Sequence, residues 1–140
     1  MSVTARSFIT KLESRDLKYT YNEATQERNE NVRVSFNGKY GNTVALNFFI
    51  DHDGTTVNIK VFTICKCLEE KLMEMYVQLN QLNFDYRWVK FYLDNDNEVT
   101  VSGDAVVNPE TAGEELYELM ARYLNIIDEV YPRIMKVVIG

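Results

Sequence analysis

Three side chains in this sequence are of the kinds that bind metals or act as nucleophiles: His52, Cys65 and Cys67. A structural zinc site takes four ligands, commonly as spaced C-x2–4-C and H-x3–5-H pairs, and only three are available here without that spacing. His52 stands beside turn-forming residues at a predicted hairpin tip, where it is solvated. A reactive cysteine needs a neighbour that lowers its pKa, and Lys66 alone is weak support for that. We therefore predict that the cysteines are small apolar side chains at a strand end and helix start, with no metal.

A second group of chemically capable side chains is the acidic set Asp94, Asp96 and Glu98. The calcium loop of EF-hands requires glycine at its sixth position and glutamate at its twelfth, which here are Val99 and Ala105. Neither glycine-rich phosphate-binding pattern occurs in the chain. The acidic residues are ordinary turn formers between two strands. No constellation for catalysis emerges, so we predict a protein that is not an enzyme and has no cofactor.

The most informative segment gathers aromatic side chains and interleaves them with bases. In a strand predicted over Asp85–Leu93, alternation places Tyr86, Trp88 and Tyr92 on one side and Val89, Phe91 and Leu93 on the other. Both sides are largely apolar, whereas an antiparallel sheet covered on one face normally alternates apolar with polar residues. Either helices cover both faces of this sheet, or another chain covers one. We favour a protein interface and take as its candidate residues Tyr86, Trp88 and Tyr92.

The elements that position these residues follow from hydrophobic spacing. Apolar residues at helical spacing predict helices over 4–14, from about Lys66 to Leu82, and from Asn108, with Asn108 as the N-cap and Pro109 at the first helical position. Pro132 is expected to kink or end the last helix. Alternation of period two predicts strands over 32–36, 44–50, 57–62, 85–93 and 98–107. The order is α-β-β-β-α-β-β-α, with room for an extra short strand near Lys18–Glu23. We predict an α+β fold: an antiparallel sheet packed with helices in one domain, residues 1–140.

Composition narrows the classes of partner. The 140 residues carry a formal net charge of −6, whereas proteins that bind nucleic acid usually have an excess of Lys and Arg. No apolar run approaches the roughly 20 residues needed to span a membrane. The first residues do not form a signal peptide, and two cysteines do not make a secreted disulfide framework. The sequence therefore predicts a cytoplasmic protein that binds neither nucleic acid nor membrane.

Two segments resemble a known family. The stretches FDYRWVKFYLD (84–94) and VSGDAVVNPETAGEE (101–115), together with the element order, resemble the YbjN-like family, regulators of bacterial sensory transduction. The resemblance implies a fold similar to that of the type III secretion chaperones, which are homodimers that bind extended segments of client proteins. It supplies no catalytic motif.

Two functional hypotheses follow. The first is a regulatory or chaperone-like module that binds protein, forms a homodimer and presents a groove to a client segment. The alternative is a carrier whose Tyr, Phe and Met residues enclose a small apolar ligand. An enzyme is the weakest hypothesis, because it would need a cleft with perturbed titrating groups.

Overall fold

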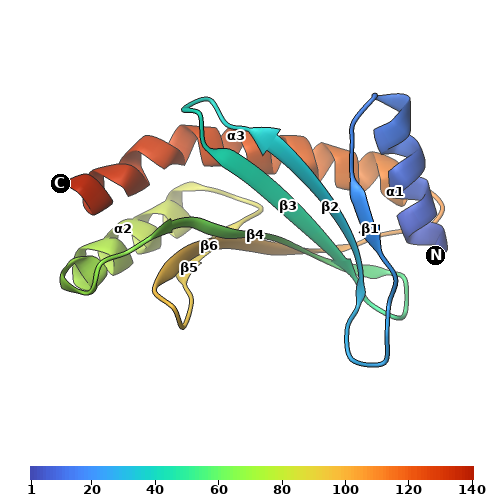
Figure 1. Ribbon diagram of the computed structural model, residues 1–140, viewed down its shortest axis with the longest axis horizontal. Helices are drawn as coiled ribbons and strands as arrows, with labels where there is room; N and C mark the ends of the chain where they lie inside the picture. Colours follow the sequence, from blue (N-terminus) through green and yellow to red (C-terminus); the bar gives the residue numbers. More distant parts are fainter.

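The computed structural model describes residues 1–140 and consists of one antiparallel sheet with three α-helices (Figure 1). The order of elements predicted from the sequence is confirmed, including the extra short strand. The elements are α1 (Val3–Ser14), β1 (Thr20–Asn22), β2 (Glu30–Asn37), β3 (Thr43–Ile50), β4 (Thr56–Lys66), the 3-10 turn η1 (Glu69–Lys71), α2 (Leu72–Asp85), β5 (Lys90–Leu93), β6 (Glu98–Val106) and α3 (Ala112–Ile139).

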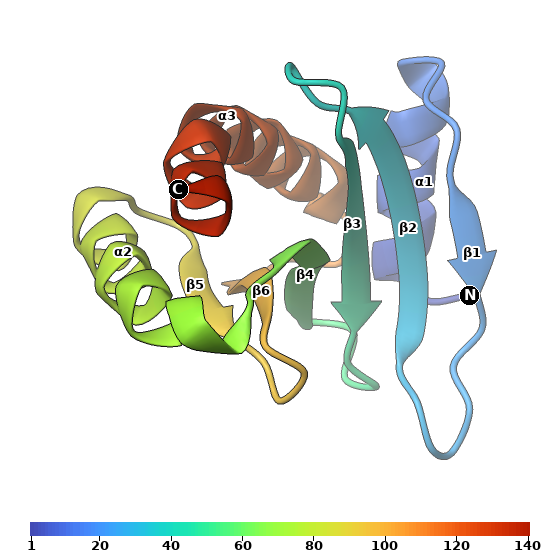
Figure 2. The same ribbon diagram turned by 60° about the vertical axis from the view of Figure 1, so that its left-hand side comes forward.

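The six strands are arranged in the order β1-β2-β3-β4-β6-β5, and every neighbouring pair is antiparallel. The sheet is strongly curved, and α1 and α3 lie against the same face of it (Figure 2). Helix α2 lies at one end of the molecule, next to β5 and α3. The other face of the sheet has no helix over it.

The core forms on the helix side because the strands alternate. In β3, Val44, Leu46, Phe48 and Ile50 are buried, and the side chains between them are not. One cluster of 30 buried apolar residues joins this face to α1, α2 and α3. The sequence left open whether helices cover both faces or another chain covers one. The structure decides that the helices cover only one face.

The N-terminus of α1 is tied to the sheet by a buried carboxylate. Ser2 caps the helix, because its hydroxyl accepts a hydrogen bond from the backbone N–H of Ala5 at 3.0 Å. The Ser2 hydroxyl also donates to Glu30, whose other oxygen accepts from the Ser2 backbone N–H at 2.9 Å and from the Tyr21 hydroxyl. Glu30 therefore holds α1 and the edge strand β1 together at the start of β2.

The predicted strand over Asp85–Leu93 is wrong in its first half. Asp85 ends α2, and the strand is only Lys90–Leu93. Residues up to Asp85 are helical and not extended because the helix buries Leu79 and Leu82 against the core. The chain then turns at Trp88, which has a left-handed backbone with φ of 76°. A strand cannot contain that conformation, so alternation could not extend back to Asp85.

The start of α3 also differs from the prediction. Asn108 and Pro109 form a turn, in which the Asn108 side chain accepts from the backbone N–H of Glu110 at 3.0 Å, and the helix begins at Ala112. The cap comes from another helix instead: the Ser7 hydroxyl of α1 accepts from the Gly113 N–H at 2.9 Å. A side chain distant in sequence thus replaces the local cap that the residue types suggested.

Of the two outcomes expected at Pro132, a kink or an end of the last helix, the structure excludes the end. Helix α3 continues through Pro132 to Ile139. Proline removes one backbone hydrogen bond inside a helix. Beyond it, however, Ile134 and Val137 are buried in the core, and their burial offsets that loss.

Candidate protein-binding surfaces

The side of α2 that faces away from the protein is apolar. We call Met73, Tyr76, Val77, Asn80 and Phe84 the outer α2 face. The four apolar members are all exposed, from 50% for Tyr76 to 85% for Phe84. On the opposite side of the same helix, Met75, Leu79 and Leu82 are buried. Helix α2 is therefore apolar on two sides but packed on only one.

Charged residues stand at both ends of this face. Glu69 and Glu70 lie in the turn before α2, and Glu74 follows in its first turn. The side chain of Arg87, just past the other end, is exposed and has no ion-pair partner. The face thus has an acidic N-terminal end, an apolar middle and a basic residue at its C-terminal end.

The second unpartnered surface is the face of the sheet opposite the helices, which we call the open sheet face. One row of side chains crosses all six strands, because their residues are directly paired in register. The row is Thr20, Arg33, Asn47, Lys60, Ser102 and Lys90. A parallel row runs through Asn22, Asn31, Phe49, Asn58 and Asp104. This face is mainly polar, with Phe49, the half-exposed Phe62 and the carboxylate of Asp104 among its side chains, and it carries cations on β2, β4 and β5.

The aromatic residues predicted to share one strand face lie in different places. Tyr86 follows α2, and burial together with a hydrogen bond to Glu129 of α3 raises its pKa. Trp88 is half exposed, with the Arg122 guanidinium of α3 5.2 Å from its ring centre. Tyr92, on β5 between the inward-facing Phe91 and Leu93, belongs to the open sheet face. The predicted single surface of Tyr86, Trp88 and Tyr92 is therefore not formed.

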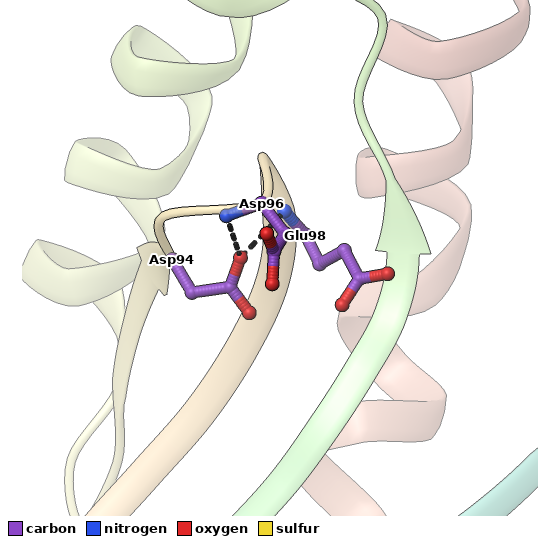
Figure 3. A group of neighbouring side chains, drawn as sticks. All are labelled: Asp94, Asp96 and Glu98. Carbon is purple, nitrogen blue, oxygen red and sulfur yellow. Dashed lines mark hydrogen bonds between the residues drawn. The ribbon is translucent and has the colours of Figure 1, made fainter.

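The acidic set Asp94, Asp96 and Glu98 comes together at the turn between β5 and β6 (Figure 3), with one oxygen of each carboxylate within 4.8 Å of the others. One oxygen of Asp94 accepts the backbone N–H groups of Asp96 and Glu98 at 2.9 and 3.0 Å. Thr63 donates to Glu98 at 2.9 Å. The Asp94 carboxylate is thus used to shape the hairpin, which is the turn-forming role that the sequence indicated.

The other chemically capable residues stand apart from one another. Burial raises the pKa of the Cys65 thiol to about 11, and burial also raises that of Cys67. Both thiols are therefore protonated at neutral pH, a state that is a poor nucleophile and metal ligand. His52 is exposed in the turn after β3, with Nε2 3.2 Å from the Thr25 carbonyl oxygen. It does not meet the cysteines, which lie at the far end of β4.

Sequence reasoning missed both unpartnered surfaces, for different reasons. A signal for the outer α2 face was present, because Met73, Val77 and Phe84 repeat at helical spacing on the side opposite Leu79. Only the stripe that contains Leu79 was identified from the sequence, and the outer α2 face was not. The open sheet face had no readable signal, because Arg33 and Lys60 become neighbours in a row only through strand register.

The fold, a curved antiparallel sheet with helices on one side, is of the type III secretion chaperone class. The chain is similar to the structure titled "Structure of the heterodimeric complex ExoU-SpcU from the type III secretion system (T3SS) of Pseudomonas aeruginosa". Sequence identity is 13%, the TM-score is 0.56, and the match covers 92% of this chain and 95% of that one. At this identity the likeness establishes the fold alone.

The chain belongs to the YbjN family. The family described as "Putative bacterial sensory transduction regulator" matches residues 10–135. The structure titled "Crystal structure of YbjN, a putative transcription regulator from E. coli" is similar with a TM-score of 0.59 and 12% identity, covering 89% of each chain. The resemblance noted in the sequence is thereby confirmed. No curated protein matches the sequence.

None of the helices combines the length and the apolar character that crossing a membrane requires.

Proposed function

We propose that this protein is a regulatory or chaperone-like module without enzymatic activity, which acts in the cytoplasm as a single domain and forms a homodimer through its outer α2 face. Membership of the YbjN family and the chaperone-like fold support a role in binding proteins. The observation that carries the dimer is the second apolar side of α2, which faces no other element.

The spacing of this face suits a helix partner. Met73, Val77, Asn80 and Phe84 follow steps of four, three and four, the spacing of the a and d positions along which two helices pack in a coiled coil. Contiguous exposed apolar surface of this kind marks interaction sites. Asn80 falls in the middle of the seam, where a polar residue sets register at some cost in stability.

A second copy of the chain is the partner that the charges favour. A two-fold interface brings the same patch of both copies together, and we take the two α2 helices to pack antiparallel because the charges at the two ends of the face then oppose each other. That arrangement sets the unpaired Glu70 of one copy beside Arg87 of the other, whereas Glu74 is already paired with Lys71 of its own chain. Opposite charges at the rim of an interface fix its orientation more than they raise its affinity. The apolar middle supplies most of the affinity.

The interface residues proposed from the sequence, Tyr86, Trp88 and Tyr92, can be tested by the same measurement of oligomeric state. Tyr86 is largely covered by α3, and Tyr92 faces the other way, on the open sheet face. Trp88 has the most exposed ring of the three. A Trp88→Glu variant therefore distinguishes an interface that extends past α2 from one confined to it.

The experiment is light scattering coupled to size exclusion across a hundredfold range of protein concentration. We expect a dimer for the wild type and a monomer for the double variant Val77→Glu/Phe84→Glu. The matched control is Arg6→Glu, which adds charge at an exposed position of α1 and should leave the dimer intact. A wild type that remains monomeric at every concentration contradicts the dimer. A dimer that survives the double change places it elsewhere, and its loss with Trp88→Glu would extend the interface to that residue.

The alternative function, a carrier of small apolar ligands, has no comparable support. The largest surface hollow, of about 590 Å³ between α1 and the start of α3, has only Val3 as a hydrophobic lining residue. The large residues that suggested an apolar pocket, such as Phe8, Phe48 and Tyr123, instead fill the core.

A further inference from the structure

Three of the cations that have no ion-pair partner, Arg33, Lys60 and Lys90, lie in one row on the open sheet face. The ion pairs of Lys11, Lys71, Arg122 and Arg133 all join side chains in or next to the helices. Arg33, Lys60 and Lys90 have no carboxylate within 4.0 Å, although the chain has 21 acidic residues against 15 basic ones. An acidic protein thus leaves one row of positive charge unneutralised across a single face.

A hollow of about 350 Å³ opens on this face beside Arg33. Its lining includes Ala45, a small residue between larger neighbours, and Asn31. The Asn31 side-chain oxygen accepts from Asn22 at 3.3 Å, but its amide nitrogen has no hydrogen-bond partner although the residue is only 9% exposed. A buried donor without an acceptor costs free energy, which makes an acceptor supplied by a ligand favourable.

From this geometry we propose that the hollow binds a carboxylate of an acidic, extended segment of a protein partner. Arg33 supplies the positive charge and a planar pair of N–H donors. The Asn31 amide nitrogen, which is shielded from solvent in the free protein, becomes a further donor if the side chain turns toward the hollow. Lys60 and Lys90 continue the row and attract further acidic residues of the same segment. The proposal rests on the proposed function only in taking the partner to be a protein.

The segment that fits is extended and short. Neighbouring strands lie about 4.8 Å apart, so the row from β1 to β5 spans roughly 24 Å, the length of about seven extended residues. Apart from Ser102, which is buried, the row offers side chains to a ligand, so recognition depends on charge and hydrogen bonds to side chains. The absence of a long apolar stripe on this face distinguishes such a ligand from a second copy of α2.

Acidic peptide is favoured over single-stranded nucleic acid by two observations. The net charge of −6 repels a polyphosphate at long range. Bases bind single-strand proteins by stacking on aromatic faces. Here Phe49 and Phe62 pack against each other at 76°, with ring centres 6.3 Å apart, and Lys60 lies over Phe62. Phe62 is 50% exposed and lines the hollow, but the edge-to-face pair does not offer the flat series of rings on which successive bases stack.

The test is a titration of 15N-labelled protein with the acidic peptide acetyl-(Glu-Ala)5-amide, followed by the backbone and side-chain amide signals. We expect saturable shifts of the Asn31 side-chain amide and of the backbone at Arg33, Ala45 and Asn47. The peptide acetyl-(Lys-Ala)5-amide should cause none. Shifts confined to other surfaces, or no saturable shift with the acidic peptide, would overturn the proposal. So would binding of the oligonucleotide (dT)10 to this face in preference to the peptide.

Two variants probe the hollow without touching α2. Arg33→Gln removes the charge, and Ala45→Leu fills the hollow while leaving all charges in place; each should weaken peptide binding about tenfold, because a charged hydrogen bond or the space for one is lost. Arg6→Gln, at an exposed and unpaired arginine of α1, should bind as the wild type does. Unchanged affinity in both hollow variants contradicts the site. Repeating the titration with Val77→Glu/Phe84→Glu separates the two proposals, since peptide binding should persist whether or not the protein is a dimer.

Discussion

The outer α2 face and the open sheet face are both free of other elements, yet they differ in chemistry. The first is a seam of Met, Tyr, Val and Phe side chains on one rigid helix. The second is a row of Arg, Lys, Asn and Ser side chains drawn from six strands. Apolar area stabilises a complex by its removal from water and is indifferent to charge. A cationic row attracts acidic partners and is weakened by salt. One protein can therefore hold a copy of itself and an acidic segment at separate places.

The largest expected effect is a difference in the free energy of unfolding between substitutions on the two sides of α2. Leu79→Ala, on the buried side, should lower the free energy of unfolding by about 2–5 kcal/mol, because it leaves a cavity in the core. Val77→Ala, two residues earlier on the outer side, should change it by less than about 0.5 kcal/mol in the monomer. Urea unfolding at low protein concentration measures both values. Equal losses would mean that the outer side is packed within the monomer.

The next effect separates the two faces of the sheet. Gly103 on β6 faces the helices, where an added Cβ would overlap the Tyr123 hydroxyl and lie 2.6 Å from the Trp88 carbonyl oxygen. That hydroxyl donates to the same carbonyl at 3.0 Å, so the Gly103→Ala change disturbs a buried contact. We expect a loss of about 1–3 kcal/mol of stability.

The matched change on the open face is Arg33→Ala, which should stay within about 0.5 kcal/mol of the wild type. Thermal and urea unfolding compare the two variants directly. A neutral Gly103→Ala would show that Tyr123 can move without cost, and that the inner face is less tightly packed than its burial indicates.

Salt should weaken binding at the two surfaces to very different extents. Raising NaCl from 0.05 to 1 M should weaken binding of the acidic peptide about tenfold, or about 1.4 kcal/mol, because the screening length falls to about 3 Å at 1 M. Dimerisation through the outer α2 face should weaken by much less, since its apolar middle carries no charge. Fluorescence titration and light scattering in the same buffers measure the two equilibria. Equal salt dependence would contradict the division of roles.

The smallest effect concerns Glu30, which anchors β1 beside the hollow. Burial alone raises the pKa of this carboxyl, but hydrogen bonds from Ser2 and Tyr21 outweigh it and lower the pKa below its ordinary value. The stabilisation is therefore present above the unfolded pKa of about 4.3 and is lost as the pH falls through the lower folded value. Glu30→Gln should cost about 1 kcal/mol at pH 7.

Thermal unfolding of the wild type and Glu30→Gln from pH 7 to pH 3 provides the measurement. The difference between them should shrink as the solution becomes acidic. The same anchor raises the pKa of Tyr21 to about 12, mainly through burial and the bond to Glu30. Stability from Tyr21 is therefore fully present below pH 10 and lost as the pH rises toward 12. A constant difference between the two proteins at all pH values would show that the charge of Glu30 is immaterial.

The strands and their order could be predicted because their signals are local. Val44, Leu46, Phe48 and Ile50 alternate with polar or small residues, and Asp53-Gly54 closes the hairpin that follows with a left-handed glycine at φ of 74°. The strands predicted over 32–36, 44–50 and 57–62 are therefore confirmed. The strand prediction failed over residues 85–88 because aromatic residues suit a strand, whereas helix α2 extends to Asp85 and the chain then turns at Trp88.

The candidate surfaces also depend partly on local sequence and partly on the pairing of distant strands. The sequence by itself determined the class of fold, the family and the order of the elements, because periods of two and 3.6 residues are properties of neighbouring positions. The tertiary structure alone decided that no helix covers the second face of the sheet, and that Tyr86, Trp88 and Tyr92 separate. It also decided that Arg33 and Lys60 lie in one row beside the unpartnered amide of Asn31. Such neighbours arise from the pairing of distant strands, and the energy of that pairing belongs to the whole sheet and to no single segment.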